Sequence, residues 1–303
     1  IDCKIIDFII YSAIIISIYG ILQKLGFDLE RGYNVKGFSV FSTMYNQNFY
    51  ATYLVLILPI IIHKIMVNDN RRYYIFFALI FHNLLLTNTR GAWLGFIISF
   101  ILYFILYFKY QKSKNAKLKF SMILIIIVSL FVMYDLNSSG LLMKRFLSIF
   151  SDAKGLMTEV NINQIGSNRG YIWERTLRYI FKKPIEGYGI QNIMLYFLAD
   201  YGKEMNAIFG QLLLVNNVHN EYLQIAVSTG IPSLIVYLSF LFNVIIIGIK
   251  KIEFDLIYIA FLSSLIAYII QAFFSLSFIS VAFIFWVFLG LLVNNNKLFS
   301  GKF

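Results

Sequence analysis

Residues 49–67 read FYATYLVLILPIIIHKIMV, an apolar run in which Lys64 is the one charged side chain. A helix that crosses the hydrocarbon core of a bilayer needs about 20 mainly apolar residues, so this stretch predicts a membrane-spanning helix. The same reasoning applied to the whole chain predicts eight spans, at about 5–22, 49–67, 73–87, 91–108, 120–134, 231–249, 254–274 and 277–293. The predicted fold class is all-α, a polytopic helical membrane protein.

The composition supports this interpretation. Of the 303 residues, 59% are apolar or aromatic and 14% are charged, and the mean hydropathy is +0.74. An ordinary soluble domain is about 45–50% apolar and about 25% charged, so a soluble enzyme is excluded. The single cysteine, Cys3, excludes an intramolecular disulfide framework and a metal site built from several cysteines.

The predicted spans divide the chain into three parts. Residues 1–134 hold five N-terminal spans, residues 135–220 form one large polar loop domain, and residues 221–303 hold three C-terminal spans. The connections between the other spans are short.

Lysine and arginine in the short loops predict the orientation, because cytoplasmic loops carry an excess of these residues. One orientation places thirteen cations in the cytoplasm: Lys4, Lys64, Arg71, Arg72, Lys109, Lys112, Lys114, Lys117, Lys119, Lys250, Lys251, Lys297 and Lys302. The short loops on the other side then carry four: Lys24, Arg31, Lys36 and Arg90. We therefore expect both termini in the cytoplasm and loop 135–220 outside. This pattern accounts for most of the net charge of +11, so nucleic acid is not an expected partner.

The loop domain contains a predicted amphipathic helix that follows Asn168, a candidate N-cap, and stops at Pro184. Its apolar positions follow the 3.6-residue period, and its other face carries Arg175, Arg178 and Lys182. This helix either lies on the outer leaflet with its cations near lipid phosphates, or packs on the protein with a solvated basic face.

Few polar residues are candidates for chemistry. Arg90 lies in the tight turn TNTRGAW at 87–93, at a membrane boundary, where it either snorkels to lipid phosphate or binds a diphosphate bidentately. His63 is expected at a membrane interface, and His82 is expected to bond between helices. His219 differs, because it lies in the polar loop next to Asn220 and Glu221 and can act as a general base near neutral pH.

The loop carboxylates suggest no metal site. They are scattered, without the spacing of a metal-binding motif, and the sequence shows no nucleophile elbow and no glycine-rich phosphate loop. A reaction here would use an acid–base residue and cations at a membrane surface. That combination suggests group transfer from a lipid diphosphate.

Four sequence elements resemble the bacterial O-antigen ligase and polysaccharide polymerase superfamily. TNTRGAWLG at 87–95 resembles its T-x-S-R-G-A-W-L-G stretch, and Leu22-Gln23 with GFSVFSTMYNQNFYATY at 37–53 is similar to an N-terminal segment of the family. Arg169, Trp173, Pro184, Gly187 and Gly189 match its R-x-x-x-W … P-x-x-G-x-G element. VHNEYLQ at 218–224 resembles its H-N-x-y-L-q motif. The family commonly has further N-terminal spans, so we expect helices upstream of Ile1.

The resemblance implies a multispanning glycosyltransferase of the bacterial inner membrane whose outer loop holds the active site. It implies a polyprenyl-diphosphate-linked glycan donor, inversion at the anomeric carbon, and no metal or other cofactor. Carried over by position, His219 is the acid–base residue, Arg90 and Arg169 hold the diphosphate, and Asn220 orients His219 or a sugar hydroxyl.

Two questions stay open at this level. The acceptor is a second glycan, lipid A core or a protein, since a polymerase and a ligase present a hydroxyl to the same base. The alternative function classes are a polysaccharide or lipid transporter (flippase) and a noncatalytic membrane protein. A transporter predicts charged residues near the bilayer midplane and related halves, whereas the chain shows no internal repeat.

Overall fold

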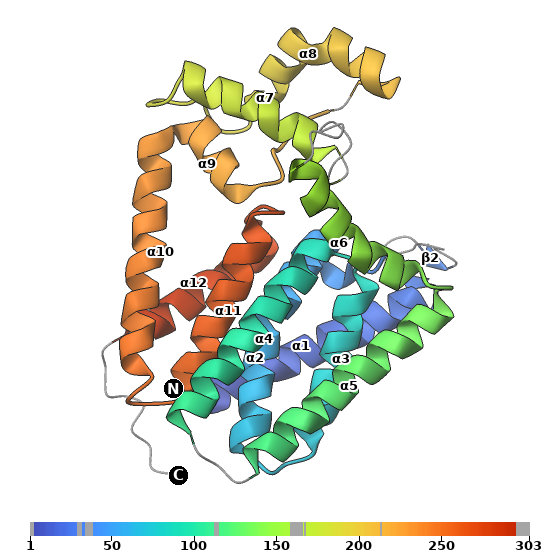
Figure 1. The fold of residues 1–303 in the computed structure, drawn as a ribbon, viewed down its shortest axis with the longest axis vertical. Coiled ribbons are helices and arrows are strands. Elements are labelled where there is room, and N and C mark those ends of the chain that lie inside the picture. Colours follow the sequence, from blue (N-terminus) through green and yellow to red (C-terminus); the bar gives the residue numbers. More distant parts are fainter. Residues whose placement is uncertain are drawn as a thin grey trace. The chain divides into compact units, whose positions relative to one another are not determined.

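The computed structural model describes residues 3–28, 32–33, 39–111, 115–157, 166, 168–212 and 214–294. Over these residues the chain is almost entirely helical, with one short 3-10 helix at Ser42–Met44 and one antiparallel pair of strands, β1 (Phe27–Asp28) and β2 (Gly32–Tyr33) (Figure 1). The helices are α1 (Cys3–Lys24), α2 (Gln47–Val67), α3 (Arg72–Leu86), α4 (Arg90–Tyr110), α5 (Ala116–Asn137), α6 (Leu141–Met157), α7 (Arg169–Lys182), α8 (Ile193–Phe209), α9 (Glu221–Thr229), α10 (Ile231–Lys251), α11 (Ile257–Ala272) and α12 (Ile279–Val293).

Each predicted span coincides with a helix: α1 to α5 and α10 to α12. Of these, α1, α2, α4, α5 and α10 are long and apolar enough to cross a membrane. The apolar helices α3, α11 and α12 have 15, 16 and 15 residues, which is shorter than the roughly 20 residues of a typical span. The chain is therefore an all-α polytopic membrane protein, while the number of eight spans stays a prediction.

The chain forms two compact units. The first, called here the membrane unit, contains Ile1–Phe146, Val244–Gln271 and Ser277–Phe303. The second, the loop unit, contains Leu147–Asn243 and Ala272–Leu276. The predicted division at 134 and 220 stays a prediction, and α10 contributes residues to both units.

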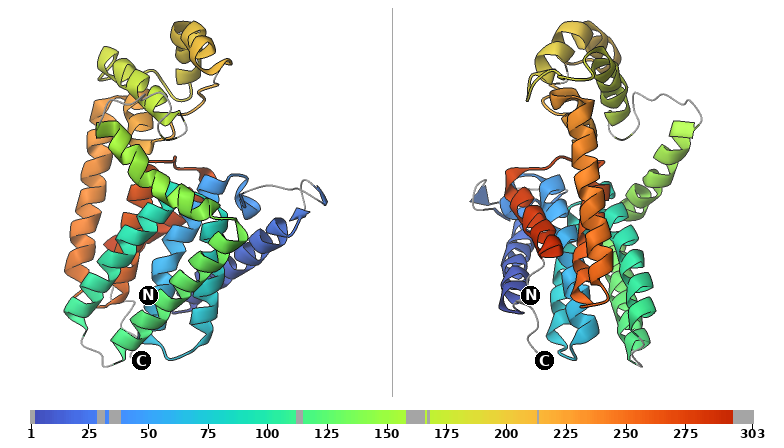
Figure 2. Two further views of the ribbon diagram at one scale, coloured as in Figure 1. Left: turned by 45° about the vertical axis from the view of Figure 1, so that its right-hand side comes forward. Right: turned by 90° about the vertical axis from the view of Figure 1, so that its left-hand side faces the viewer.

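Helix α2 is the centre of the membrane unit. Its residues from Tyr50 to Met66 are buried, and α1, α3, α4, α5 and α12 all pack against it (Figures 1 and 2). A helix that is apolar on every side is typical of an enclosed position. This explains why the run at 49–67 lacks a polar face.

Pro59 lies inside α2 and removes one backbone donor from the helix. Close to this position, the hydroxyl of Ser264 in α11 donates to the Leu56 carbonyl oxygen at 2.6 Å. A side chain from a neighbouring helix thus provides a donor to α2 in the region that the proline disturbs, as expected for a proline tolerated in a membrane helix.

Several predicted cytoplasmic cations gather where α2 ends. Lys64 pairs with Asp7 of α1 at 2.9 Å. Lys119 pairs with Asp69 at 2.9 Å, and its ammonium group donates to the carbonyl oxygens of Met66 and Asn68 at 3.2 and 2.9 Å. Lys119 thus satisfies carbonyls at the C-terminus of α2. Lys112, Lys114, Lys297 and Lys302 lie outside the described residues.

We predicted His63 at a membrane interface, but the structure encloses its side chain between helices. It is buried, and its Nδ1 lies 3.2 Å from the hydroxyl of Tyr103 in α4. The neighbouring helix covers this side of α2, which the apolar pattern of a single helix does not reveal.

Gln23 organises the chain that enters α2. Its Oε1 accepts hydrogen bonds from the backbone N–H groups of Phe41 and Ser42 at 3.0 and 2.9 Å, and its Nε2 donates to Asp28 at 2.9 Å. Asn46 then caps α2 by accepting from the Asn48 N–H at 2.7 Å. These contacts account for the Leu22-Gln23 element and for the described part of segment 37–53; Gly37 and Phe38 lie outside the described residues.

We expect Gly95→Ala to destabilise the membrane unit. A Cβ at Gly95 would lie 2.7 Å from the backbone carbonyl oxygen of Ala267 in α11, so α4 and α11 would have to separate. Gly290→Ala is the matched control, because nothing lies within 4 Å of a Cβ there. Thermal unfolding in detergent should show a lower midpoint for Gly95→Ala and an equal or higher midpoint for Gly290→Ala. Equal midpoints for both variants would contradict the close packing of the two helices.

Candidate active site

The loop unit is built on a core beneath α7, α8 and α9. Tyr171, Tyr179, Phe197, Val218 and Val227 are among its buried side chains. Of the apolar positions predicted for α7, Ile172, Thr176 and Ile180 are buried and Trp173 packs against this core, whereas Leu177 and Phe181 are exposed. Asn168 stands at the N-cap position of α7, yet it has a left-handed backbone (φ 70°) and its side chain makes no capping hydrogen bond.

Side chains from two helices hold the peptide groups next to His219. The carbonyl oxygen of Val218 accepts from Trp173 Nε1 of α7 at 3.0 Å, and the Val218 N–H donates to Gln224 Oε1 of α9 at 2.9 Å. Gln224 is itself held, because its Nε2 donates to the Ser228 hydroxyl at 3.0 Å. The residue before His219 therefore has both backbone polar groups fixed by side chains.

His219 has a left-handed backbone with φ 55°, a conformation that a residue other than glycine adopts at some cost. Its side chain is exposed. Asn220 follows it, is buried, and caps α9 by accepting from the Leu223 N–H at 3.0 Å. The chain thus turns sharply at His219 and presents the imidazole to solvent between two anchored residues.

The structure brings Arg169 and His219 together in the loop unit. Partial desolvation lowers the pKa of His219 below its ordinary value, and the positive charge of Arg169 lowers it further. Both effects favour the neutral imidazole, which is the form that accepts a proton. Glu221 is buried, and its Oε1 accepts from the Tyr237 hydroxyl at 2.6 Å.

The segment from Pro184 to Gly189 is joined to the end of α9 by backbone hydrogen bonds. The N–H groups of Tyr188 and Gly189 donate to the carbonyl oxygens of Val227 and Ser228 at 2.8 and 2.9 Å. The Ile231 N–H donates to the Pro184 carbonyl oxygen at 2.7 Å. Gly187 (φ 68°) has no room for a side chain, since a Cβ would lie 2.6 Å from the Ser228 carbonyl carbon. The P-x-x-G-x-G element therefore holds the C-terminal end of α9, the helix that follows His219, in place.

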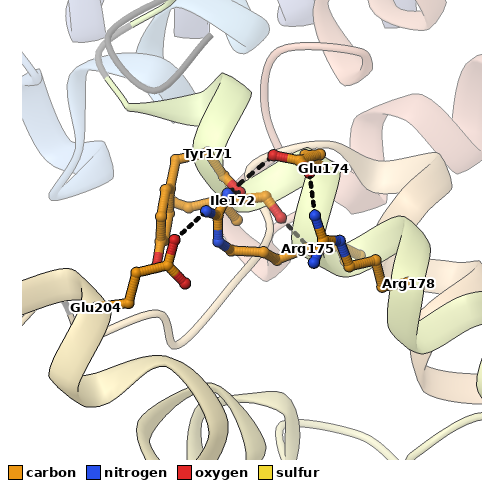
Figure 3. A network of polar contacts seen from close by, with 7 residues as sticks. Tyr171, Ile172, Glu174, Arg175, Arg178 and Glu204 are labelled. Carbon is orange, nitrogen blue, oxygen red and sulfur yellow. Dashed lines mark hydrogen bonds and ion pairs between the residues drawn. The ribbon is translucent and has the colours of Figure 1, made fainter. Parts of the chain in front are cut away.

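Arg175 corrects the sequence prediction of a basic face on α7. It is buried, its guanidinium stacks over the Tyr171 ring at 3.4 Å, and it pairs with Glu204 of α8 and with Glu174 (Figure 3). Arg178, in contrast, is exposed and pairs with Glu174 at 2.6 Å. The prediction is wrong for Arg175, which joins α7 to α8 inside the loop unit, while Arg178 and Lys182 are exposed as expected.

Arg90 lies in the membrane unit as the first residue of α4. The preceding turn is fixed from within: the Thr87 hydroxyl donates to the Leu84 carbonyl oxygen at 2.7 Å, and Trp93 Nε1 donates to the same oxygen at 3.2 Å. Asn88 adopts φ 53°. The turn at 87–89 therefore starts α4 abruptly, with Arg90 half-buried at its N-terminus.

Sequence reasoning assigned no role to Trp173 or Gln224, although both belong to the quoted motifs. Both side chains bond the backbone of Val218, which is far from Trp173 in the sequence. Residue type alone therefore did not indicate these contacts. Among the residues that the structure describes, no group of three or more His, Cys, Asp or Glu side chains forms a candidate metal site.

Comparison with known proteins identifies a family. A sequence model for a family described as O-antigen ligase matches residues 75–238, which is more than half of the chain. The matched range includes the turn before α4, helix α7 and the His219 segment. No curated protein matches the chain.

We expect Trp173→Phe to loosen the His219 segment while the ring contact with Phe273, now at a centroid distance of 5.3 Å, is kept in part. The substitution removes the hydrogen bond from the indole N–H to the Val218 carbonyl oxygen. Its loss should lower the free energy of unfolding of this segment by about 1 kcal/mol. Hydrogen–deuterium exchange of the peptide covering 214–222 should become faster. Trp286→Phe, at an exposed position of α12, is the control and should leave this peptide unchanged. Equal exchange in both variants would contradict the role of Trp173.

Proposed function

Because this chain belongs to the O-antigen ligase family, we propose that it transfers a glycan from a polyprenyl-diphosphate donor to an acceptor hydroxyl. The family supports a membrane enzyme of surface polysaccharide assembly, and the five long apolar helices support a multipass protein. We place it in the bacterial inner membrane with both termini in the cytoplasm and loop 135–220 outside.

The observation that carries the proposal is the presentation of His219. An exposed imidazole follows a peptide held on both sides by Trp173 and Gln224. Arg169 acts on it electrostatically and favours its neutral form. A positioned neutral imidazole near a cation suits a reaction in which a proton is removed while negative charge develops elsewhere.

The proposed reaction is a single displacement. His219 accepts the proton of the acceptor hydroxyl as that oxygen forms a bond to the anomeric carbon. The bond between the anomeric carbon and the diphosphate oxygen breaks, and the polyprenyl diphosphate leaves with the bonding electron pair. Attack opposite to the leaving group inverts the anomeric configuration. The products are the extended glycan, the lipid diphosphate and the proton on His219.

The sequence motifs, and not a geometric argument, assign Arg90 and Arg169 to the diphosphate. Guanidinium groups match phosphate oxygens bidentately and stabilise the charge of the leaving group. In this proposal they take the part that a divalent cation plays in other glycosyltransferases. Asn220 acts by capping α9, which holds His219 in its turn; contact with a sugar hydroxyl remains a second role for it.

The acceptor is the finer part of the proposal. A glycan, lipid A core and a protein all offer a hydroxyl, and the proposed reaction is the same for each. Deletion of the gene separates a polymerase from a ligase: single repeat units on the lipid carrier indicate a polymerase, and long unligated chains indicate a ligase.

We expect His219→Ala to abolish transfer while the protein still inserts into the membrane and binds the donor. Loss of a general base typically costs about 10²–10⁴-fold in rate. Transfer is measured with purified protein and lipid-linked donor, with and without excess chelator. Asn216→Ala, at an exposed position of the same segment, is the control. Near-normal product from His219→Ala would refute the base, and loss of wild-type activity in chelator would refute the metal-free mechanism.

The pH dependence of transfer tests the coupling of His219 and Arg169. The base works when neutral, so the rate falls as the pH drops through its pKa, and a lowered pKa places this fall below about pH 6.5. Arg169→Gln removes the like charge, raises the pKa of His219, and should move the acidic limb of kcat/KM to higher pH. Arg169→Lys keeps the charge and should move it less.

A weaker but unshifted profile for Arg169→Gln would mean that Arg169 binds the donor without influencing the base. Such a result would separate the two roles proposed for Arg169, which are binding of the donor and lowering of the pKa of His219.

A further inference from the structure

Aromatic side chains from three segments of the loop unit meet beside the His219 turn. Phe273, in the segment that follows α11, lies at the centre of this group. Its ring centroid is 5.3 Å from that of Trp173 in α7 and 6.5 Å from that of Tyr222 in α9. Phe274 lies 5.2 Å from Phe273 and 6.4 Å from Trp173 by the same measure. These four residues are called here the aromatic cluster.

The aromatic cluster is tied to the chain on both sides of His219. Trp173 donates its hydrogen bond to the carbonyl oxygen of Val218, one residue before His219. Tyr222 stands in the first turn of α9, three residues after His219. A molecule that presents a hydroxyl to the imidazole has to rest on the surface around this turn, and the aromatic cluster forms part of that surface.

Phe273 is exposed although other rings contact it. Its exposed fraction is 46%, while Trp173 and Tyr222 are half-buried. The planes of Phe273 and Trp173 meet at 80°, and rings packed edge to face hold each other in a defined orientation. Phe273 is therefore a supported ring with accessible surface.

A sugar is the ligand that such a surface fits. One face of a pyranose carries mainly C–H groups, whose weakly positive hydrogens are attracted to the negative face of an aromatic ring. The hydroxyls at the rim of the sugar remain available, and one of them can meet the imidazole. An acyl chain has no hydroxyl to offer. An extended peptide is commonly held through backbone hydrogen bonds, which aromatic rings do not supply.

We propose that Phe273, supported by Trp173 and Tyr222, binds a sugar of the acceptor and places its hydroxyl at His219. This inference rests on the proposed function and narrows its acceptor to a saccharide. Donor and acceptor then have chemically different contacts, arginines for the diphosphate and uncharged rings for the sugar. Phe273 lies outside the range that the family model matches, as suits a residue that selects the acceptor while the shared motifs carry the chemistry.

The binding test uses oligosaccharides released by mild acid from the lipid carrier of the deletion strain, and from its lipid A where it has any. They are titrated against the purified full chain in detergent. Saturation-transfer NMR, with irradiation of the aromatic resonances, detects the sugar protons that approach the rings. For the wild type we expect saturation of the C–H protons on one face of a sugar.

Variants of Phe273 separate ring stacking from apolar packing. Phe273→Ala should weaken binding of the oligosaccharide by about tenfold. Phe273→Leu keeps the apolar bulk without the ring face and should weaken it equally, whereas Phe273→Tyr should bind as the wild type does. The comparison of Leu with Tyr decides the matter even if the alanine variant folds poorly. Phe181→Ala is the matched control, because Phe181 is an exposed phenylalanine of the same unit, on α7, and its loss should leave the affinity unchanged.

Turnover with the lipid-linked donor separates acceptor binding from the chemistry. Phe273→Leu should raise the KM for the acceptor oligosaccharide about tenfold and leave the KM for the donor unchanged. His219→Ala should instead lower kcat.

Three results would overturn the inference. They are the absence of saturation on the sugar protons of the wild type, equal effects of Phe273→Ala and Phe181→Ala, or wild-type binding by Phe273→Leu. The last would mean that the ring serves only for apolar packing or contact with membrane lipid. If the Phe273 variants bind and transfer normally while His219→Ala is inactive, this inference fails and the proposed function stands. If the wild type transfers no glycan from the lipid-linked donor, both fail.

Discussion

The interior of a bilayer offers no water to a backbone N–H or C=O, and the architecture of this protein follows from that constraint. Helix α2 must meet this constraint while other helices enclose it on every side. Ser264 donates to the Leu56 carbonyl near Pro59, and Lys119 donates to the carbonyls of Met66 and Asn68 where the helix ends. Ser264 and Lys119 therefore provide backbone hydrogen bonds that lipid cannot supply.

The same demand shapes the loop around His219. Here the backbone makes a turn that no regular ladder can satisfy, and side chains supply the partners instead. Trp173 and Gln224 take the two peptide groups of Val218, and Asn220 takes an N–H of α9. The backbone of residues 188 and 189 then closes on the end of α9. A rigid support on both sides leaves the imidazole exposed and its backbone held in a left-handed conformation.

The arginines show which properties of a side chain the local sequence predicts and which depend on the tertiary fold. On the helix that begins at Arg169, the cations Arg175, Arg178 and Lys182 recur every three or four residues and look equivalent in the sequence. Arg175 was therefore predicted to lie with Arg178 on a solvated face. Glu204, which neutralises Arg175, comes from a different helix and is reached only through the fold. A buried charge needs such a partner, so its burial cannot be read from the period of one helix.

The sequence by itself determined the helical membrane class, the positions of the apolar helices and the family, because these depend on local hydropathy and on short motifs. It also singled out His219 and Arg169, whose motifs the structure places in one unit, although their roles remain proposals. Only the tertiary structure decided that Trp173 and Gln224 hold the peptide before His219, that His63 is enclosed beside Tyr103, and that Arg175 is internal. These facts depend on contacts between residues distant along the chain. A hydrogen bond or ion pair of that kind is set by how whole helices pack, and no periodicity within one segment encodes it.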